Sequence, residues 1–283
     1  MLSRDLTAYD IILVNTSAGK DSEVMLDYVY GMAVQQGVSD RVVAVHCDLG
    51  RSEWAGTKAL AEKQCDRYGV PMHVISRDRD ILHQVEFERG KWMSPQVRFC
   101  TSDHKRDQVT KVITKLVEAF NLKTWGRAKG RKLPAVRVLN CIGLRAEEST
   151  ARRKEPVFRT GERGSSSVRQ IDRWLPIHDW TEAQVWDLIH GKGLAYHRAY
   201  DLGMPRLSCV FCIFAPEPAL LTAGYHNRPL LDAYVAVETR IGHAFKYDSD
   251  TAQPEPLIAI QAKLEAGWVP AGRIDASLWK ECA

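Results

Sequence analysis

The sequence predicts an α/β protein built on a doubly wound parallel sheet, followed by a small helical region. Apolar runs of strand length alternate with helical patterns along the first part of the chain, which is typical of parallel strands joined by helical crossovers. The first of these runs enters a turn of small residues that opens a helix. From residue 216 the pattern is helical. We therefore expect an α/β domain over residues 1–215 and a helical C-terminal extension over residues 216–283.

The composition is that of a globular protein. The 283 residues are enough to bury a full core, and 45% of them are hydrophobic while 26% are charged. No apolar run approaches the roughly 20 residues of a membrane helix, and the N-terminus, with Asp5 and Asp10, lacks a signal-peptide core. We expect a cytoplasmic protein without membrane contact. The net charge of +4 points to no particular partner.

The first strand and the helix after it enclose the most informative segment. The run Ile11 to Val14 predicts a buried strand, and Met25, Leu26 and Val29 mark the following helix. The six residues of the intervening turn are Ser17, Ala18, Gly19, Lys20, Asp21 and Ser22. A strand that feeds such a turn binds anions, because backbone N–H groups and the helix N-terminus converge there.

The side chains of this turn suit phosphate. Gly19 allows close approach of the backbone, the hydroxyls of Ser17 and Ser22 can donate hydrogen bonds, and Lys20 supplies charge. The Walker motif differs, because it requires Lys followed directly by Ser or Thr, and here Asp21 intervenes. The alternative is an ordinary strand, turn and helix with a serine cap.

Further strands and helices follow in alternation. The sequence predicts strands at 41–46, 72–75 and 136–144, with helices over 55–68 and after residue 106. Thr181 and Gln184 form a capping box that opens another helix. The segment from Glu155 to Arg173 is rich in Gly, Ser and Arg, and we expect a mobile basic loop able to close over substrate.

Charged residues stand where strands end. Asp48 follows the second strand, and ligands of parallel sheets bind outside the carboxyl ends of strands. A helix-capping role for Asp48 is the alternative. Arg145 follows a later strand, and its planar guanidinium binds oxyanions in a bidentate manner while keeping its charge. The basic stretch from Lys123 to Arg137 is either a solvated face or a surface for a polyanion.

Seven cysteines are an odd number for a disulfide framework, so metal binding or thiol chemistry explains the clustered ones better. Cys209 and Cys212 are two residues apart, which lets both sulfurs point at one metal. This spacing alone is compatible with zinc, an iron–sulfur centre or a redox pair.

The turn resembles the S-G-G-K-D-S loop of the PP-loop ATP pyrophosphatases, with Ala18 in place of one glycine. The segment from Gly143 to Arg152 is similar to the G-x-R-x-x-E-S-x-x-R pattern of the branch that holds the sulfonucleotide reductases and the sulfur-transfer proteins of DNA phosphorothioation. The resemblance covers roughly residues 8–215. It implies that the loop grips nucleotide phosphates, that Asp48 lies near the nucleotide, and that Arg145 and Arg152 hold its phosphate or sulfate end. Lys20, Asp21 and Arg145 are then the expected catalytic residues.

The resemblance also bears on the cysteines. Similarity to cluster-bearing sulfur-transfer proteins favours an iron–sulfur cluster, of the 4Fe–4S type, on Cys100, Cys209 and Cys212. Two features depart from the reductases. They carry a cysteine pair in the segment where this chain has Cys100 alone, and their E-C-G-[IL]-H tail is matched only by Glu281 and Cys282. The role of Cys282 stays open.

The function that these features favour is an ATP pyrophosphatase that adenylylates an acceptor for sulfur transfer, most closely resembling DNA phosphorothioation proteins. The expected cofactors are ATP, Mg²⁺ and the cluster. The expected partners are a cysteine desulfurase and DNA, bound directly or through another protein, and a homodimer is left open. The alternatives are a reductase of adenylyl sulfate or phosphoadenylyl sulfate, and a non-catalytic ATP-sensing module of a DNA-defence complex.

Overall fold

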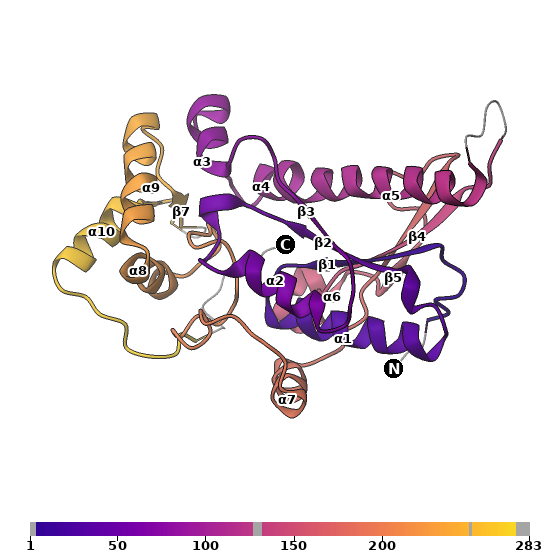
Figure 1. The fold of residues 1–283 in the computed structure, drawn as a ribbon. Coiled ribbons are helices and arrows are strands. Elements are labelled where there is room, and N and C mark those ends of the chain that lie inside the picture. Colours follow the sequence, from indigo (N-terminus) through magenta and orange to yellow (C-terminus); the bar gives the residue numbers. More distant parts are fainter. Residues whose placement is uncertain (1–3, 127–131, 249–250, 276–283) are drawn as a thin grey trace. The chain divides into compact units, whose positions relative to one another are not determined.

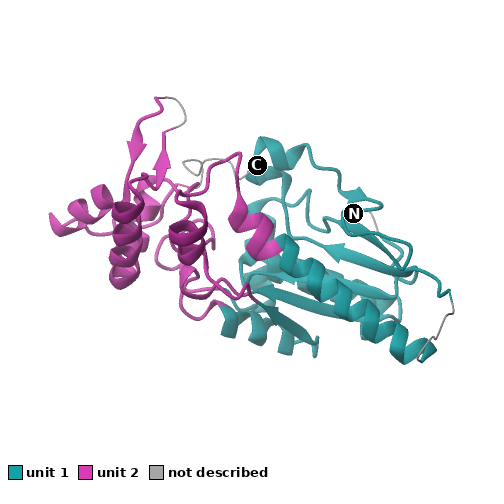
Figure 2. Ribbon diagram, turned by 90° about the horizontal axis from the view of Figure 1, so that it is seen from above, with its two compact units in different colours: residues 1–47, 58–75, 106–196 teal, residues 48–57, 76–105, 197–283 magenta. Residues whose placement is uncertain are grey.

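The computed structural model describes residues 4–126, 132–248 and 251–275. The chain divides into two compact units (Figure 2). The first unit comprises residues 1–47, 58–75 and 106–196, and the second comprises residues 48–57, 76–105 and 197–283. Each unit therefore collects segments that are distant in the sequence. The boundary expected at residue 215 stays a prediction.

The first unit is built on a six-stranded sheet in the order β3-β2-β1-β4-β6-β5 (Figure 1). Its strands are β1 (Ile11–Thr16), β2 (Val42–Cys47), β3 (Met72–Ile75), β4 (Val136–Cys141), β5 (Phe158–Arg159) and β6 (Arg169–Trp174). All neighbouring pairs are parallel except β5 with β6. The predicted strands β1 to β4 and the doubly wound α/β class are confirmed.

Helices cover both faces of this sheet. They are α1 (Lys20–Gln35), α2 (Thr57–Asp66), α5 (Asp107–Trp125), α6 (Thr150–Arg153) and α7 (Glu182–Lys192). Successive residues of a strand point to opposite faces. Ile12 and Val14 accordingly belong to one hydrophobic cluster with α1 and α7, whereas Ile11 and Leu13 belong to another with α5. The two clusters fix the register of β1 and bring its carboxyl end to the start of α1.

The segment expected to be a mobile loop contains two strands instead. The prediction for Glu155 to Arg173 was wrong, because β6 runs parallel to β4 and β5 pairs with it. Ile171 and Trp174 are buried, and the polar residues between them find partners in the fold. Asp172 accepts a hydrogen bond from the Tyr9 hydroxyl at 3.0 Å, and Arg173 donates to Glu155 at 2.5 Å.

The second unit is mainly helical. Its regular elements are α3 (Ile81–His83), the π-helical segments Gln84–Arg89 and Ser102–Arg106, α4 (Phe99–Thr101), α8 (Glu217–His226), α9 (Arg228–Ile241), β7 (Lys246–Tyr247), β8 (Pro254–Glu255) and α10 (Leu257–Glu265). Trp92 stacks on Tyr234 with ring centroids 5.4 Å apart, and the Tyr234 hydroxyl bonds Ser52 Oγ at 3.1 Å. A single hydrophobic cluster thus joins all three segments of the unit. The helical C-terminal pattern is confirmed for α8, α9 and α10. Within the described ranges, no helix is long and apolar enough to cross a membrane.

Candidate functional site

The turn after β1 has the geometry of an anion-binding loop. Helix α1 starts at Lys20 with Gly19 as its N-cap, and no side chain caps it. Ser22 Oγ donates to the Gly19 carbonyl at 2.9 Å and accepts from the Ser17 backbone N–H at 3.2 Å. These bonds fold the turn around the Ser22 hydroxyl. The N-terminus of a 16-residue helix, where the helix dipole is positive, therefore opens at this turn.

Ala18 occupies a backbone conformation that favours glycine. Its φ is +58° and its side chain is fully buried. A left-handed conformation costs a non-glycine residue about 1–2 kcal/mol. The turn therefore keeps, in strained form, the shape that a glycine adopts freely.

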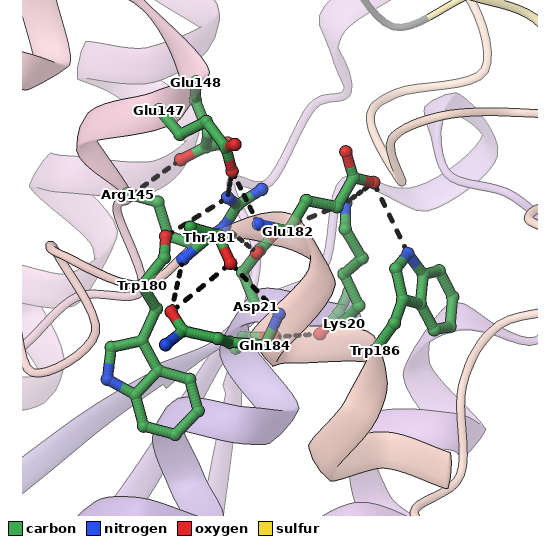
Figure 3. A network of polar contacts seen from close by, with 12 residues as sticks. Lys20, Asp21, Arg145, Glu147, Glu148, Trp180, Thr181, Glu182, Gln184 and Trp186 are labelled. Atoms are coloured by element: carbon green, nitrogen blue, oxygen red, sulfur yellow. Dashed lines mark hydrogen bonds and ion pairs between the residues drawn. The ribbon is translucent and has the colours of Figure 1, made fainter.

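Lys20 is held among carboxylates rather than in water. Its side chain is 2% exposed, with Nζ 3.5 Å from Glu182 Oε1 and 3.6 Å from Asp21 Oδ2. A lysine is buried only when its charge is compensated. Figure 3 shows the Glu182 carboxylate between the ends of Lys20 and Trp186. Glu182 thus brings the N-terminus of α7 into the site.

Arg145 lies on the other side of Asp21. It follows β4, its side chain is 4% exposed, and its Nε donates to Asp21 Oδ1 at 2.5 Å. Its Nη1 donates to Glu147 Oε2 at 2.6 Å. Burial acts against the charge of Arg145, but the neighbouring carboxylates outweigh burial and raise the pKa of Arg145 above its ordinary value. Arg145 is therefore a permanent buried cation.

Gly143 allows the loop after β4 to lie against the start of α1. A Cβ at this position would lie 3.2 Å from the Asp21 carbonyl oxygen and 3.3 Å from its carbonyl carbon. Only glycine therefore fits without a shift of the Asp21 backbone. The sequence-predicted residues Lys20, Asp21, Gly143 and Arg145 are thus brought together in the first unit.

Arg152 is bound within its own segment. Its guanidinium forms an ion pair with Glu148, which also accepts from the Arg145 backbone N–H at 2.8 Å. The Arg152 backbone N–H is capped by Ser149 Oγ at 3.1 Å. Arg152 therefore supports the Arg145 segment through Glu148, and its expected contact with a nucleotide stays a prediction.

Asp48 belongs to the second unit, immediately after β2. Its Oδ1 accepts from the Gly50 backbone N–H at 2.8 Å, which closes the turn before a short 3-10 helix at Gly50–Ser52. The capping alternative is not borne out, because the N-cap of this helix is Leu49 and no side chain caps the helix. Its expected place near the nucleotide stays a prediction.

The three candidate metal ligands lie in the second unit. Cys100, Cys209 and Cys212 are partly buried against the same hydrophobic cluster, and none of the described cysteines forms a disulfide. Burial, together with Cys100 and Glu53, raises the pKa of Cys209 to about 11, although Lys105 opposes the rise. In the described part of the chain, no three His, Cys, Asp or Glu side chains are arranged to hold a single metal ion.

Other sequence predictions fall partly or wholly outside the described residues. The basic stretch begins within α5, which ends at Trp125, and continues into residues 127–131, which are not described. Cys282 also lies outside the described ranges.

Glu147 and Glu182 were not among the site residues predicted from the sequence. Glu182 lies between Thr181 and Gln184, whose predicted capping box the structure confirms. Its contact with Lys20 depends on the sheet, which brings β1 and the segment after β6 together. An acidic first residue in a helix that follows a strand was the available signal.

These features define an α/β domain in which a turn with anion-binding geometry lies beside two buried cations. Residues 11–215 match the phosphoadenosine phosphosulfate reductase domain. Because this match spans well over half of the chain, the protein belongs to that family. The family assignment supports an enzyme and confirms the resemblance seen in the turn.

Two curated proteins illustrate the relationship. An uncharacterised 37.8 kDa protein of Escherichia phage 186 is 26% identical over 160 residues, which cover 56% of this chain and 42% of that protein. The adenosine 5′-phosphosulfate reductase of Neisseria meningitidis is 36% identical over 70 residues, which cover 25% of this chain and 27% of the reductase. The chain thus matches less than half the length of these relatives.

A solved structure shares the fold. A variant of the FMN adenylyltransferase of Candida glabrata has a TM-score of 0.51 and 13% identity, with 98% of this chain and 82% of that chain covered. Likeness at this level of identity concerns the fold alone.

Proposed function

We propose that the protein cleaves ATP between its α and β phosphates and uses the adenylyl group to activate an acceptor for sulfur transfer. The observation that supports this is the position of Asp21, whose two carboxylate oxygens contact Lys20 and Arg145 at the start of α1. Two cations in fixed positions beside a phosphate-binding turn suit a ligand with several phosphates. DNA phosphorothioation is the process that the sequence resemblance favours.

The chemistry requires charge stabilisation more than proton transfer. An acceptor oxygen attacks the α phosphorus, the bond to the bridging oxygen breaks, and pyrophosphate leaves with the electron pair. The terminal sulfur of a cysteine-desulfurase persulfide then attacks the activated acceptor and displaces AMP. A thiol reductant cleaves the resulting disulfide and leaves the sulfur on the acceptor. Lys20 and Arg145 would offset the charge that develops on the phosphate oxygens, and their burial strengthens this effect.

Magnesium is expected to accompany the nucleotide. Magnesium would be held mainly by the phosphates of the nucleotide and by water, with at most one or two protein carboxylates. The residues of the turn bind and orient the phosphates, and the carboxylates of Asp21 and Glu147 hold Arg145 in place.

Product analysis tests this proposal. The full chain should convert ATP to AMP and pyrophosphate, with a rate that rises when the correct acceptor, for example DNA, is added. The Ser17→Ala and Asp21→Ala variants should lose turnover. Production of ADP and orthophosphate without AMP would overturn the proposal, and nucleotide binding without turnover under all acceptor conditions would favour the ATP-sensing module.

A second candidate is a sulfonucleotide reductase, because two curated relatives are adenosine 5′-phosphosulfate reductases that match 70 residues of this chain. A reductase needs a thiolate that attacks the sulfur of its substrate. Release of sulfite from adenylyl sulfate in the presence of thioredoxin, abolished by Cys282→Ser, would establish this alternative. For the sulfur-transfer enzyme, the same variant should retain ATP cleavage.

We also propose that Cys100, Cys209 and Cys212 carry an iron–sulfur cluster. Their common hydrophobic surroundings and the influence of Cys100 on Cys209 support this. The thiolates that hold a cluster bind different iron atoms, so they need not surround one ion. Anaerobic preparations should contain iron and sulfide, which Cys209→Ser should remove. Cys65→Ser, a buried thiol of the first unit, is the matched control. Stoichiometric zinc without iron would contradict the cluster.

A further inference from the structure

Glu182 places a second carboxylate at the buried ammonium of Lys20. Lys20 is the cation of the phosphate-binding turn, and Glu182 Oε1 lies 3.5 Å from its Nζ. A phosphate oxygen that binds Lys20 must therefore share this ammonium with Glu182 or displace it. Glu182 comes from α7, far from the turn in the sequence.

Glu182 is anchored through its backbone, and its carboxylate accepts a hydrogen bond from Trp186. Its backbone N–H donates to Glu147 Oε2 at 2.5 Å, and Glu147 in turn binds Arg145. The indole Nε1 of Trp186 donates to Glu182 Oε1 at 3.4 Å. The N-terminus of α7 is therefore tied to the Arg145 segment, and the carboxylate is directed at Lys20 by Trp186.

The contact between Glu182 and Lys20 affects anion binding because carboxylates outnumber cations in this network. The described network contains three cationic side chains and four carboxylates, so it carries one formal negative charge. They are Lys20, Arg145 and Arg152, with Asp21, Glu147, Glu148 and Glu182. An approaching polyanion is repelled unless a carboxylate moves or is neutralised.

Glu182 is the carboxylate best placed to move. Its side chain is 29% exposed, compared with 18% for Asp21 and 7% for Glu148. Glu147 is more exposed, but it holds both Arg145 and the N-terminus of α7. A rotation of Glu182 toward solvent would uncover Lys20 without disturbing Arg145.

We propose that Glu182 is a specificity-determining residue that competes with the ligand's phosphates for Lys20. A singly or doubly charged anion gains too little from Lys20 to displace the Glu182 carboxylate. A pyrophosphate group can displace this carboxylate, because it also reaches Arg145. The carboxylate thus lowers affinity for all anions but selects for those with several phosphates. This inference rests on the proposed nucleotide site and names the residue that sets its selectivity.

Calorimetric titration of the full chain with inorganic pyrophosphate tests the proposal. Glu182→Gln should bind pyrophosphate about tenfold more tightly than the wild type, because the substitution removes the negative charge that competes for Lys20. Trp186→Phe keeps an aromatic ring but removes the indole N–H, so a smaller gain of about two- to threefold is expected. Asp187→Asn makes the same charge change at an exposed position of α7, and it should stay within about twofold of the wild type.

A further readout separates competition from a structural effect. The Glu182→Gln variant should gain more affinity for sulfate than for pyrophosphate, and so lose part of its preference for pyrophosphate. A helix merely loosened by the substitution would leave this preference unchanged, and circular dichroism verifies that both proteins are folded.

The outcomes distinguish this inference from the function on which it rests. If the wild type binds pyrophosphate and Glu182→Gln binds it equally or more weakly, Glu182 does not compete and the nucleotide site stands. If neither protein binds pyrophosphate, the site and the inference both fail.

Discussion

Lys20 and Arg145 of the first unit are buried beside carboxylates, whereas Cys100, Cys209 and Cys212 of the second unit are partly buried against hydrophobic side chains. Charge is present in the first site at any pH near neutrality, since the pKa of Arg145 is raised by Asp21 and its neighbours despite burial. In the second site burial keeps Cys209 protonated, with its pKa raised to about 11.

The two sites differ in how far their side chains must change before a ligand binds. In the first site carboxylates hold Lys20 and Arg145 in position, so a phosphate finds oriented cations but must share Lys20 with Glu182 or displace Glu182. The thiols must lose protons before they bind a metal or a cluster, so binding there releases protons and depends on pH. The following predictions test this contrast.

Arg145→Lys should lower kcat/KM for pyrophosphate release by about 100-fold. A lysine keeps the charge, but a single ammonium cannot span Asp21 and Glu147 as the guanidinium does. Initial rates measured by coupled pyrophosphate detection provide the test. Arg153→Lys, an exposed position in α6, should leave the rate unchanged. Full activity of Arg145→Lys would mean that the two hydrogen bonds from the guanidinium to Asp21 and Glu147 are not required for turnover.

Glu23 is an exception within the first unit. Burial raises the pKa of its carboxyl group, as burial does for the Cys209 thiol of the second unit. It is 1% exposed, and neither of its carboxylate oxygens has a hydrogen-bond partner among the described residues. Burial, assisted by Asp27 and opposed by Arg67, raises the pKa of Glu23 from 4.5 to about 7. The folded protein therefore binds this proton more tightly than the unfolded chain does.

The sign of the pH effect follows directly. The contribution of Glu23 is fully present below about pH 4.5, falls as the pH rises, and is lost above about pH 7. Glutamine does not ionise, so Glu23→Gln should remove this loss. The change in the free energy of unfolding caused by the substitution should be about 2–3 kcal/mol more favourable at pH 8 than at pH 4.5. Urea denaturation of both proteins at each pH measures it. Parallel pH profiles of the two proteins would show that Glu23 ionises normally.

Gly143→Ala should destabilise the protein by about 1–2 kcal/mol and reduce turnover, because its Cβ would press on the Asp21 backbone. Gly31→Ala is the control, since a Cβ there meets nothing within 4 Å and the position lies inside α1. That substitution should stabilise the protein by about 0.5–1 kcal/mol. Equal effects of the two substitutions would contradict the close approach at Gly143.

Ala18→Gly should have the smallest effect, a gain of less than about 1 kcal/mol. Glycine relieves the strain of the positive φ at this position, but it also gives the unfolded chain more freedom, which offsets part of the gain. Ala18→Val, with a branched side chain in the same conformation, should instead be clearly destabilising. Thermal unfolding of the three proteins decides the order, and a Val variant as stable as the wild type would refute the strained conformation.

Much of the first unit could be predicted from local sequence. The strands β1, β2 and β4 are buried runs of apolar residues, and the turn after β1 is a contiguous motif. Strand β6 was missed because its sequence alternates charged and apolar residues near Gly and Ser. Its charged side chains are satisfied only by residues from other segments, as Asp172 is by Tyr9.

The site was predictable only in part for the same reason. Lys20, Asp21 and Arg145 stand next to strand ends, where the rule for parallel sheets places ligands. Glu182 and Lys20 are far apart in the sequence and meet only in the tertiary fold. No local sequence pattern predicts their contact. The charged side chains next to strand ends could therefore be predicted from the sequence. Glu182, which contacts Lys20 from another helix, could not.

Asp21 contacts two cations through the two oxygens of one rigid carboxylate. A shift of Lys20 would therefore change the negative charge that Asp21 presents to Arg145. The two cations are coupled through a single planar group of three atoms.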